Sequence, residues 1–325
     1  MRAWAGICVA LAACEAAEVP RPTHEGRATI LAWEQRGPRA VIADETGVTW
    51  SASDRVVTLG PGDSTPRVLA SGLKFPVALC RTDVALYVAT EGSAGFGGPQ
   101  IPGEVLRVDG DGTRAIFKPT SFGPADIDCD RDGVYWSLFW TTLTPAGLFS
   151  GLMSLDPNGD PIFTLGEPYI GEYIAIDRDY LYWSVERSVM RSPRALPLAA
   201  EPVSTTTGWP TNLEISGELV WFVPSMNTGE PGTLFTATPG GTPRMLAEID
   251  DRYLSLSIAI DAAYVYWSDP RSARVMRVAQ TGGPPEVFAD LQGGPGSIAI
   301  YDGAAFWTNS DTGTVVTLST AEAAL

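Results

Sequence analysis

The sequence predicts an all-β fold, a seven-bladed β-propeller, on three observations. A unit made of an apolar four-residue run, an acidic turn and a second run ending in an aromatic residue occurs seven times. Successive aromatic residues are 37 to 49 residues apart, which is the length of a four-stranded blade. The 34 glycines and 26 prolines among 325 residues are too many turn-forming residues for a helical protein.

The repeated unit predicts the first two strands of each blade. The units begin at Val41, Ala78, Ile127, Ile174, Leu213, Ile258 and Ile298. The aromatic residues that end the second runs are Trp50, Tyr87, Trp136, Trp183, Trp221, Trp267 and Trp307. We expect each ring to pack against a neighbouring blade, where a large flat side chain buries much apolar area. The unit at Ala78 is the weakest, and a six-bladed ring is the alternative.

The remaining runs predict the third and fourth strands and the closure of the ring. Residues 275–278 and 286–289 alternate apolar and polar side chains on either side of a glycine turn. After Trp307 only one further strand, residues 314–318, fits before the last residue. Residues 29–34 resemble the outer strands, so we expect this N-terminal strand to complete the last blade and leave no open sheet edge. The predicted propeller domain covers residues 28–325.

One motif carries a family resemblance. Tyr266-Trp267-Ser268-Asp269 resembles the YWTD repeat of low-density-lipoprotein-receptor propellers, and the whole unit is similar to bacterial NHL-type propeller repeats. The resemblance implies a β-propeller. Because YWTD propellers have six blades and seven units are present here, no binding residue is carried over.

The N-terminal residues resemble those of bacterial lipoproteins. Residues 1–13 read as a signal peptide, with Arg2 before a short apolar stretch. Leu11-Ala12-Ala13-Cys14 resembles a lipobox, which implies lipidation of Cys14; a plain signal peptide is the alternative. Residues 14–27 are polar and predict a tether. We expect an exported protein anchored by lipid to the bacterial cell envelope, and by resemblance Glu15 favours the outer membrane.

The net charge of −16 excludes one class of partner. Nucleic-acid binding depends on neutralising phosphates, and an acidic chain of this kind does not supply the cations. We expect contact with the membrane through the lipid anchor only. An exported compartment also permits disulfides. Cys80 and Cys129 replace isoleucine at what we assign as the same repeat position in adjacent units, which predicts a disulfide; two small buried hydrophobic residues are the alternative.

The sequence lacks the groups that most enzymes use. His24, the one histidine, lies in the predicted tether, so a Ser-His-Asp or Cys-His mechanism is not expected. Asp109-Gly110-Asp111-Gly112 and residues 156–160 suit hairpin turns better than calcium loops, so we expect no cofactor, with calcium the less favoured interpretation. Asp44, Asp177 and Asp261 follow the first strands, where aspartate side chains cap turns.

One face of the ring is predicted to carry the function. Loops joining second to third strands, and fourth strands to the next blade, share this long-loop face, and residues 91–103, 138–150 and 224–232 are long there. Aromatic residues gather in these loops, and polar residues precede the first strands. The candidate binding residues are Phe122, Asp126, Phe139, Trp140, Tyr169, Glu172, Tyr173, Trp209, Asn212, Tyr253, Ser257 and Ser297. Alternatively, several of the rings pack only within their own loops.

We therefore expect a non-catalytic binding or scaffolding protein for a protein, peptide or glycan. The alternative is a metal-dependent hydrolase, lactonase or lyase with carboxylates in the central channel, because oxygen ligands need no histidine. Its ligands would come from Asp126, Glu172 and Asn212, with Asp128 and Glu214 on the first strands.

Overall fold

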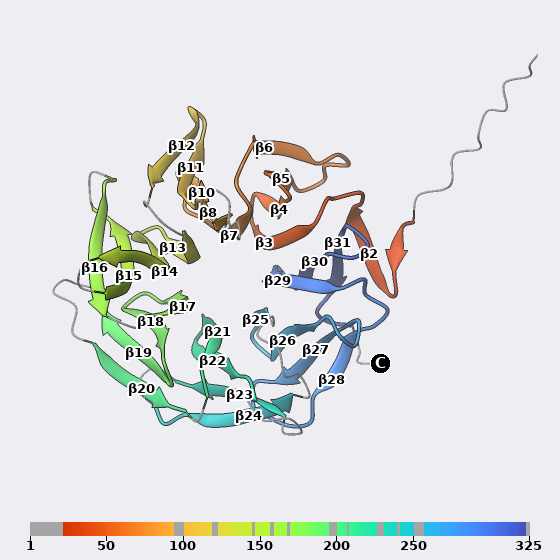
Figure 1. The fold of residues 1–325 in the computed structure, drawn as a ribbon. Coiled ribbons are helices and arrows are strands. Elements are labelled where there is room, and N and C mark those ends of the chain that lie inside the picture. The colour runs from red at the N-terminus through yellow and green to blue at the C-terminus, as the bar shows by residue number, and fades with distance from the viewer. Residues whose placement is uncertain are drawn as a thin grey trace, which may run out of the picture.

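The computed structural model describes residues 22–93, 101–118, 123–144, 147–156, 159–167, 170–194, 200–206, 208–225, 231–238, 241–249 and 257–322. Within these ranges all regular secondary structure is β-strand, and no helix is long and apolar enough to cross a membrane. Seven sheets of four or more strands surround a central axis (Figure 1). The predicted seven-bladed propeller is confirmed, and the six-bladed alternative is wrong.

The first four blades follow one another along the chain, each numbered outward from the centre. Blade 1 consists of β3 (Pro38–Asp44), β4 (Gly47–Ala52), β5 (Arg55–Leu59) and β6 (Arg67–Ser71). Blade 2 consists of β7 (Pro76–Arg81), β8 (Leu86–Thr90), β11 (Val105–Asp109) and β12 (Gly112–Phe117), with the short pair β9 (Gly92–Ser93) and β10 (Ile101–Pro102) inserted. Blade 3 consists of β13 (Pro124–Asp130), β14 (Gly133–Thr144), β15 (Gly147–Leu155) and β16 (Pro161–Glu167). Blade 4 consists of β17 (Ile170–Ile176), β18 (Tyr180–Val185), β19 (Ser188–Pro193) and β20 (Glu201–Thr205).

The last three blades complete the ring. Blade 5 consists of β21 (Thr211–Ser216), β22 (Glu218–Val223), β23 (Gly232–Ala237) and β24 (Arg244–Ile249). Blade 6 consists of β25 (Ile258–Ile260), β26 (Tyr264–Asp269), β27 (Arg274–Ala279) and β28 (Glu286–Ala289). Blade 7 consists of β29 (Pro295–Tyr301), β30 (Ala304–Asn309), β31 (Thr314–Ser319) and β2 (Ala28–Ala32), with β1 (His24–Glu25) outside β2.

An N-terminal strand closes the ring, as predicted. Strand β2 pairs antiparallel with β31, with Thr29 opposite Thr317. The small strand β1, which we expected in the tether, also packs on this blade. Its Glu25 carboxylate accepts hydrogen bonds from the Gly293 N–H and the Thr312 hydroxyl. The ordered ring therefore begins a few residues before the predicted boundary at residue 28.

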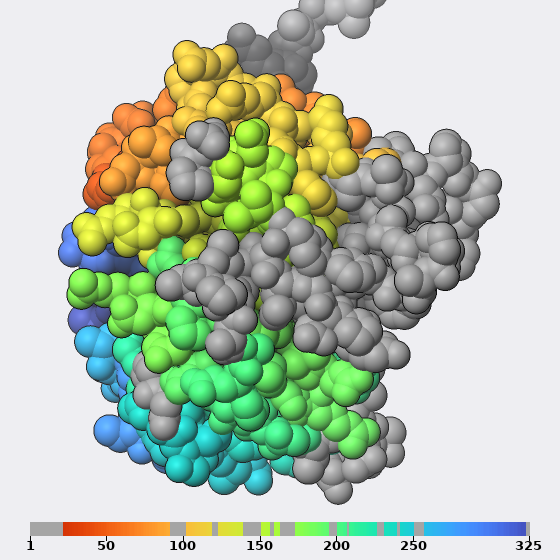
Figure 2. Space-filling model, turned by 90° about the vertical axis from the view of Figure 1, so that its left-hand side faces the viewer, coloured from red at the N-terminus to blue at the C-terminus, as the bar shows by residue number. Residues whose placement is uncertain are grey.

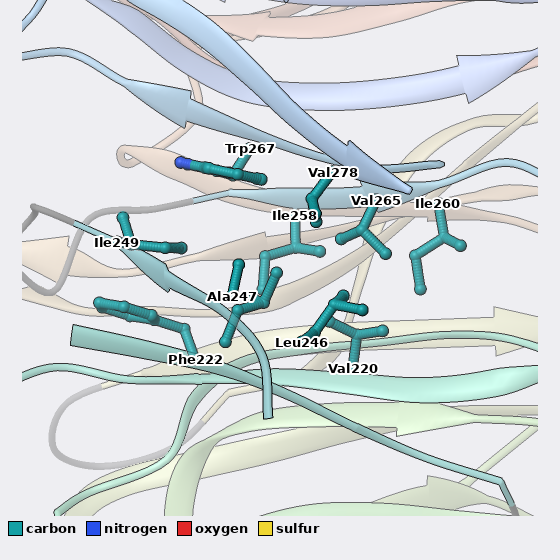
Figure 3. Close-up of a cluster of buried hydrophobic side chains, with 11 residues drawn as sticks. Val220, Phe222, Leu246, Ala247, Ile249, Ile258, Ile260, Val265, Trp267 and Val278 are labelled. Carbon is teal, nitrogen blue, oxygen red and sulfur yellow. The ribbon is translucent and has the colours of Figure 1, made fainter. Parts of the chain in front are cut away.

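Aromatic packing joins every blade except blade 2 to its predecessor. Six tryptophans, all on second strands, are almost fully buried: Trp50, Trp136, Trp183, Trp221, Trp267 and Trp307. Trp267 packs against Phe222 and Ile249 of blade 5 (Figure 3). Seen from the side, the blades lie one beside the next around the ring (Figure 2). The predicted structural role of these rings is confirmed.

Blade 2 departs from the predicted register by one residue. Leu79 pairs with Val88, as Ile258 pairs with Trp267, so this unit begins one residue later than predicted. Val88 stands in the place of the tryptophan and packs toward blade 1, whereas Tyr87 packs toward blade 3. A one-residue shift turns every side chain of a strand to its other face. The assignment of Tyr87 as the equivalent of the tryptophans is wrong.

The predicted disulfide is confirmed, and the corrected register explains it. Cys80 and Cys129 are bonded, with 5.7 Å between their Cα atoms. Cys80 is the second residue of its unit and Cys129 the third of the next, so their side chains face each other across the two blades. At the same repeat position, as we expected, both side chains would point in the same direction around the ring, because side chains alternate along a strand.

The predicted turn caps are also confirmed. Asp177 Oδ1 accepts hydrogen bonds from the N–H groups of Asp179 and Tyr180, at 2.8 and 2.7 Å, and Asp261 makes the two equivalent bonds. Asp44 accepts the N–H and the hydroxyl of Thr46. In the turn between β11 and β12, Asp109 accepts the N–H of Asp111 at 2.9 Å. Aspartates at these sites hold hairpin turns in place.

Removing the disulfide should destabilise the ring without unfolding it. The bond spans a sequence separation of 49 residues, so its loss frees the unfolded chain and should cost about 2–4 kcal/mol. Urea unfolding of the full chain, with and without reductant, measures the difference. A Cys80→Ser/Cys129→Ser double variant should match the reduced wild type and ignore reductant; a wild type that ignores reductant as well contradicts the prediction.

Candidate functional site

The first strands of the seven blades lie around the centre of the ring (Figure 1), and we call the space between them the central channel. The channel contains a cavity of about 900 Å³ to which all seven of these strands contribute. A second cavity, of about 520 Å³, lies on the side of the short turns. Asp128 and Glu214 line both cavities, so these two residues lie between the two mouths of the channel.

Polar side chains on the first strands join neighbouring blades. We call the residue paired with the second-strand tryptophan the first position, and the residue before it the leading position. Side chains at the leading and second positions face the next blade, because directions alternate along a strand. Three leading residues accept the first-position N–H of the next blade, each at 3.1 Å: Asp126 from Ile174, Ser257 from Ile298, and Ser297 from Val41.

These contacts, which we call seam bonds, satisfy edge groups of the sheets. A first strand has a partner strand on one side only, so alternate N–H groups face the channel and need acceptors. Asp128, at the second position, accepts the N–H groups of Ile176 in blade 4 and Cys129 in its own strand, at 2.9 and 2.8 Å. Cys80, also at a second position, makes the disulfide instead. Of the predicted polar residues, four line the central cavity: Asp126, Asn212, Ser257 and Ser297. Asp126, Ser257 and Ser297 join neighbouring blades.

Blade 5 lacks seam bonds although it carries polar residues at both positions. Asn212 is the leading residue and Glu214 the second residue of β21. The Asn212 Nδ2 atom is buried and has no hydrogen-bond partner among the described residues, and the backbone of Asn212 has a left-handed φ of 51°. Burial, together with the nearby carboxylates of Asp128 and Asp126, raises the pKa of Glu214 to about 8.

Asp128 and Glu214 therefore differ in charge near neutral pH. Burial raises the pKa of Asp128 to about 6, against the N–H groups of Ile176 and Cys129, which stabilise its ionised form. At pH 7 Asp128 is mostly ionised, whereas Glu214 is mostly protonated. Both line the cavities of the channel and keep part of their surface accessible. Such a pair can bind a cation by releasing a proton from Glu214.

The turn-side mouth of the channel is built from ion pairs. Arg194 donates from both terminal nitrogens to the two oxygens of Asp130, at 2.5 and 2.7 Å, and reaches the Asp177 carbonyl at 2.9 Å. Arg194 lies in blade 4 and Asp130 in blade 3, so this ion pair joins the two blades on the side of the short turns. Asp130 and Arg194 thus largely neutralise each other's charge.

The rim of the other mouth carries exposed aromatic residues. Trp209, a predicted binding residue, is 51% exposed and directly precedes Pro210, the residue before β21. Phe75, which the sequence analysis missed, is 53% exposed and precedes Pro76 in the same way. The shared proline could have revealed this equivalence. Tyr173, in contrast, is partly buried and packs against the apolar cluster between blades 4 and 5.

Several predicted residues lie outside what the structure describes. These are Phe122, Tyr169 and Tyr253, and the side chains of Phe139, Trp140 and Glu172. Their role in binding stays a prediction. Among the described residues, no group of three or more His, Cys, Asp or Glu side chains is arranged to hold a metal ion.

Solved structures share this fold. Virginiamycin B lyase from Staphylococcus aureus matches with a TM-score of 0.67 and 12% identity, over 90% of this chain and 98% of that one. A gluconolactonase from Xanthomonas campestris matches with a TM-score of 0.53 and 18% identity, over 91% of each chain. PorZ, a bacterial surface component of the type-IX secretion system of Porphyromonas gingivalis, matches with a TM-score of 0.63 and 11% identity, over 91% of this chain and 38% of that one.

At these identities the matches show the fold alone, which is the propeller architecture that the YWTD-like and NHL-like repeats imply. The chain matches no protein-family model and no curated protein.

Replacing Glu214 by glutamine should change how stability depends on pH. The pKa of the Glu214 carboxyl is about 8 in the folded state, against 4.5 for an ordinary glutamate, so the folded state binds the proton more tightly. Stability therefore falls as pH rises between these two values. Glu214→Gln should remove that loss and be more stable than wild type at pH 9, on the order of 2 kcal/mol. At pH 4 the two should be equal.

Urea unfolding at pH 4, 7 and 9 measures this effect. Glu248→Gln, on the exposed outer strand β24, removes the same charge outside the channel and should leave the pH profile unchanged. If stability changes with pH in the same way for Glu214→Gln and the wild type, the pKa of Glu214 is not raised by folding and the prediction is wrong.

Proposed function

We propose that this chain is a lipid-anchored, extracytoplasmic, non-catalytic binding or scaffolding protein that holds a protein, peptide or glycan on its long-loop face. One observation carries the non-catalytic part. Polar groups on the channel wall, including Asp126, Asp128, Ser257 and Ser297, accept backbone N–H groups that join the blades. Replacing these side chains would remove hydrogen bonds between neighbouring blades, so their role is to stabilise the ring.

The rim aromatics support binding at the long-loop face. Phe75 in the loop before blade 2 and Trp209 in the loop before blade 5 are both more than half exposed. Large aromatic side chains presented on a rigid scaffold are typical anchors of binding surfaces. Neither ring is needed to fill the core, so both are available to a partner.

An enzyme of the lyase or lactonase kind is less well supported. Two structural neighbours carry such names, but a shared fold does not transfer activity. The lyase is described as catalytically inactive when one histidine is replaced by alanine. Here the single histidine, His24, lies on β1 at the outer edge of blade 7. The channel carboxylates Asp126 and Asp128 already accept N–H groups.

An envelope location is supported by two features. The Cys80–Cys129 disulfide suits an oxidising compartment. Leu11-Ala12-Ala13-Cys14 provides a lipidation sequence ahead of the ring. PorZ, a neighbour of the same fold, is a bacterial surface component, which is compatible with such a location.

Replacing Cys14 by serine should release the protein from the membrane. The acyl chains on a lipidated cysteine supply the membrane affinity, and the variant has no thiol to modify. Fractionation of bacterial cells into soluble and membrane parts measures the change, with the Cys80→Ser/Cys129→Ser double variant as the control that keeps Cys14. A Cys14→Ser protein that stays in the membrane fraction contradicts the lipid anchor.

A photo-crosslinking residue in place of Trp209 should capture a partner in the host's own envelope. The same residue in place of Met245 is the matched control, because Met245 is 58% exposed but lies on the outer strand β24. We expect adducts from position 209 only, reduced at least fivefold by Phe75→Ala on the same rim. Equal adducts from both positions, or none from either, would contradict a binding role for this face.

A further inference from the structure

At one seam of the channel, polar side chains occupy both the leading and the second position but make no seam bond among the described residues. Between blades 3 and 4, 6 and 7, and 7 and 1, polar side chains at the leading or second position bond the next blade, and a disulfide joins blades 2 and 3. Between blades 5 and 6, Asn212 and Glu214 occupy these two positions but make no hydrogen bond to β25. We call this place the 5–6 seam.

The two polar groups at the 5–6 seam keep free bonding capacity. The Asn212 Nδ2 atom is buried from solvent and donates to no atom of the described residues. Within the part of the chain that the structure describes, Glu214 accepts a hydrogen bond from the N–H of Ile215, next to it in the chain, and from no other group. A buried donor without an acceptor costs free energy, and the cost is recovered when a ligand or water supplies the acceptor. Both side chains line the 900 Å³ cavity.

The surroundings of Glu214 are acidic on one side and apolar on the other. Asp126 and Asp128 approach from β13, and their charges contribute to the raised pKa of Glu214. On the other side, β25 presents Ile258, Ala259 and Ile260. The turn-side cavity adds the charged residues Asp130, Arg131, Asp132, Asp177 and Arg178.

The cations that line the larger cavity belong to the opposite wall and are paired. Arg81 lies 3.1 Å from Asp44, and Arg39 lies 3.5 Å from Glu91. Among the described residues, neither guanidinium forms an ion pair with the carboxyls of blades 3 and 5. The 5–6 seam therefore offers carboxylate oxygens for a cation and one amide donor for an acceptor.

We propose that the 5–6 seam binds a primary ammonium group with an adjacent carbonyl, the chemistry of an α-amino amide or of a peptide amino-terminus. The ammonium group donates to Glu214 and to Asp128, whose oxygens each accept one N–H group and keep a second lone pair. The carbonyl oxygen accepts from Asn212 Nδ2 after the buried amide rotates toward the channel. Hydrogen bonds from an ammonium group to carboxylates are stronger than neutral ones, so they fix the orientation of the ligand. This site lies within the channel and goes beyond the binding face proposed above.

Binding at this site is coupled to proton release. Glu214 is mostly protonated at pH 7 because its pKa is about 8, and it must lose the proton to pair with a cation. Affinity should therefore rise from pH 6 to pH 8, and fall above it when the α-amino group, with a pKa near 8, loses its own charge. A structural carboxyl that only lines the channel would show no such coupling.

Isothermal titration calorimetry of the full chain at pH 7 tests the proposal with four probes. Alaninamide and trialanine carry the ammonium and carbonyl together, and N-acetylalaninamide lacks the charge. Propylammonium lacks the carbonyl. We expect binding of alaninamide on the order of 1 mM or tighter, no binding of the acetylated form, and weaker binding of propylammonium. Trialanine that binds more tightly than alaninamide would identify peptides as the source of the group.

Two variants separate the roles of the residues. Glu214→Gln should weaken alaninamide binding about tenfold or more and abolish proton release, measured in buffers of different ionisation enthalpy. Asn212→Gly, which suits the left-handed φ of 51°, should weaken alaninamide but not propylammonium. Glu248→Gln on the outer strand is the matched control and should change neither.

Equal binding of alaninamide and its acetylated form would overturn the proposal, as would no binding at about 10 mM or an unaltered Glu214→Gln variant. These results would leave crosslinking from position 209 unaffected, because that test concerns the rim and not the channel. The two proposals can therefore fail separately.

Discussion

The packing of each second-strand tryptophan against the preceding blade is the interaction on which the ring depends. A buried tryptophan removes about 150–250 Å² from water, which corresponds to about 4–6 kcal/mol of gross hydrophobic free energy. A single blade cannot bury both of its faces, so this gain requires a neighbour on each side. Closure by β2 gives blade 7 its fourth strand and lets Trp50 of blade 1 pack against it. The blade count and the closing strand thus follow from one requirement.

The alternation of side chains along the first strands decides which residues pack in the apolar seams and which polar groups line the channel. First and third positions face backward into the apolar seams, so leading and second positions face forward, where the next blade offers unpaired N–H groups. Polar residues at these positions accept N–H groups of the next blade at three seams, and a disulfide joins the blades at a fourth. A polar residue that faces forward without such a bond is then unusual, which distinguishes Asn212 and Glu214 from Asp126 and Asp128.

The repeat was predictable from sequence because a 37–49-residue period, glycine turns and buried tryptophans repeat at every blade. The register of blade 2 was not, because Tyr87 is a stronger signal than Val88, and only strand pairing shows which of them faces blade 1. The disulfide was predicted from an incorrect equivalence of Cys80 and Cys129. The polar residues at the channel were found, but their role depends on N–H groups about 40 to 50 residues further along or, at the closing seam, near the start of the chain. No local pattern encodes those contacts.

A shared propeller cannot by itself distinguish a lyase, a lactonase and a surface component, because all of them provide the same rigid ring and channel. What can differ is which polar groups of the channel are left without a hydrogen bond between blades. Here the seam bonds use Asp126, Asp128, Ser257 and Ser297, and the unused groups are an amide and a protonated carboxyl. Such groups can hydrogen-bond and orient a ligand, and this property is the basis of the proposal that the channel recognises a ligand.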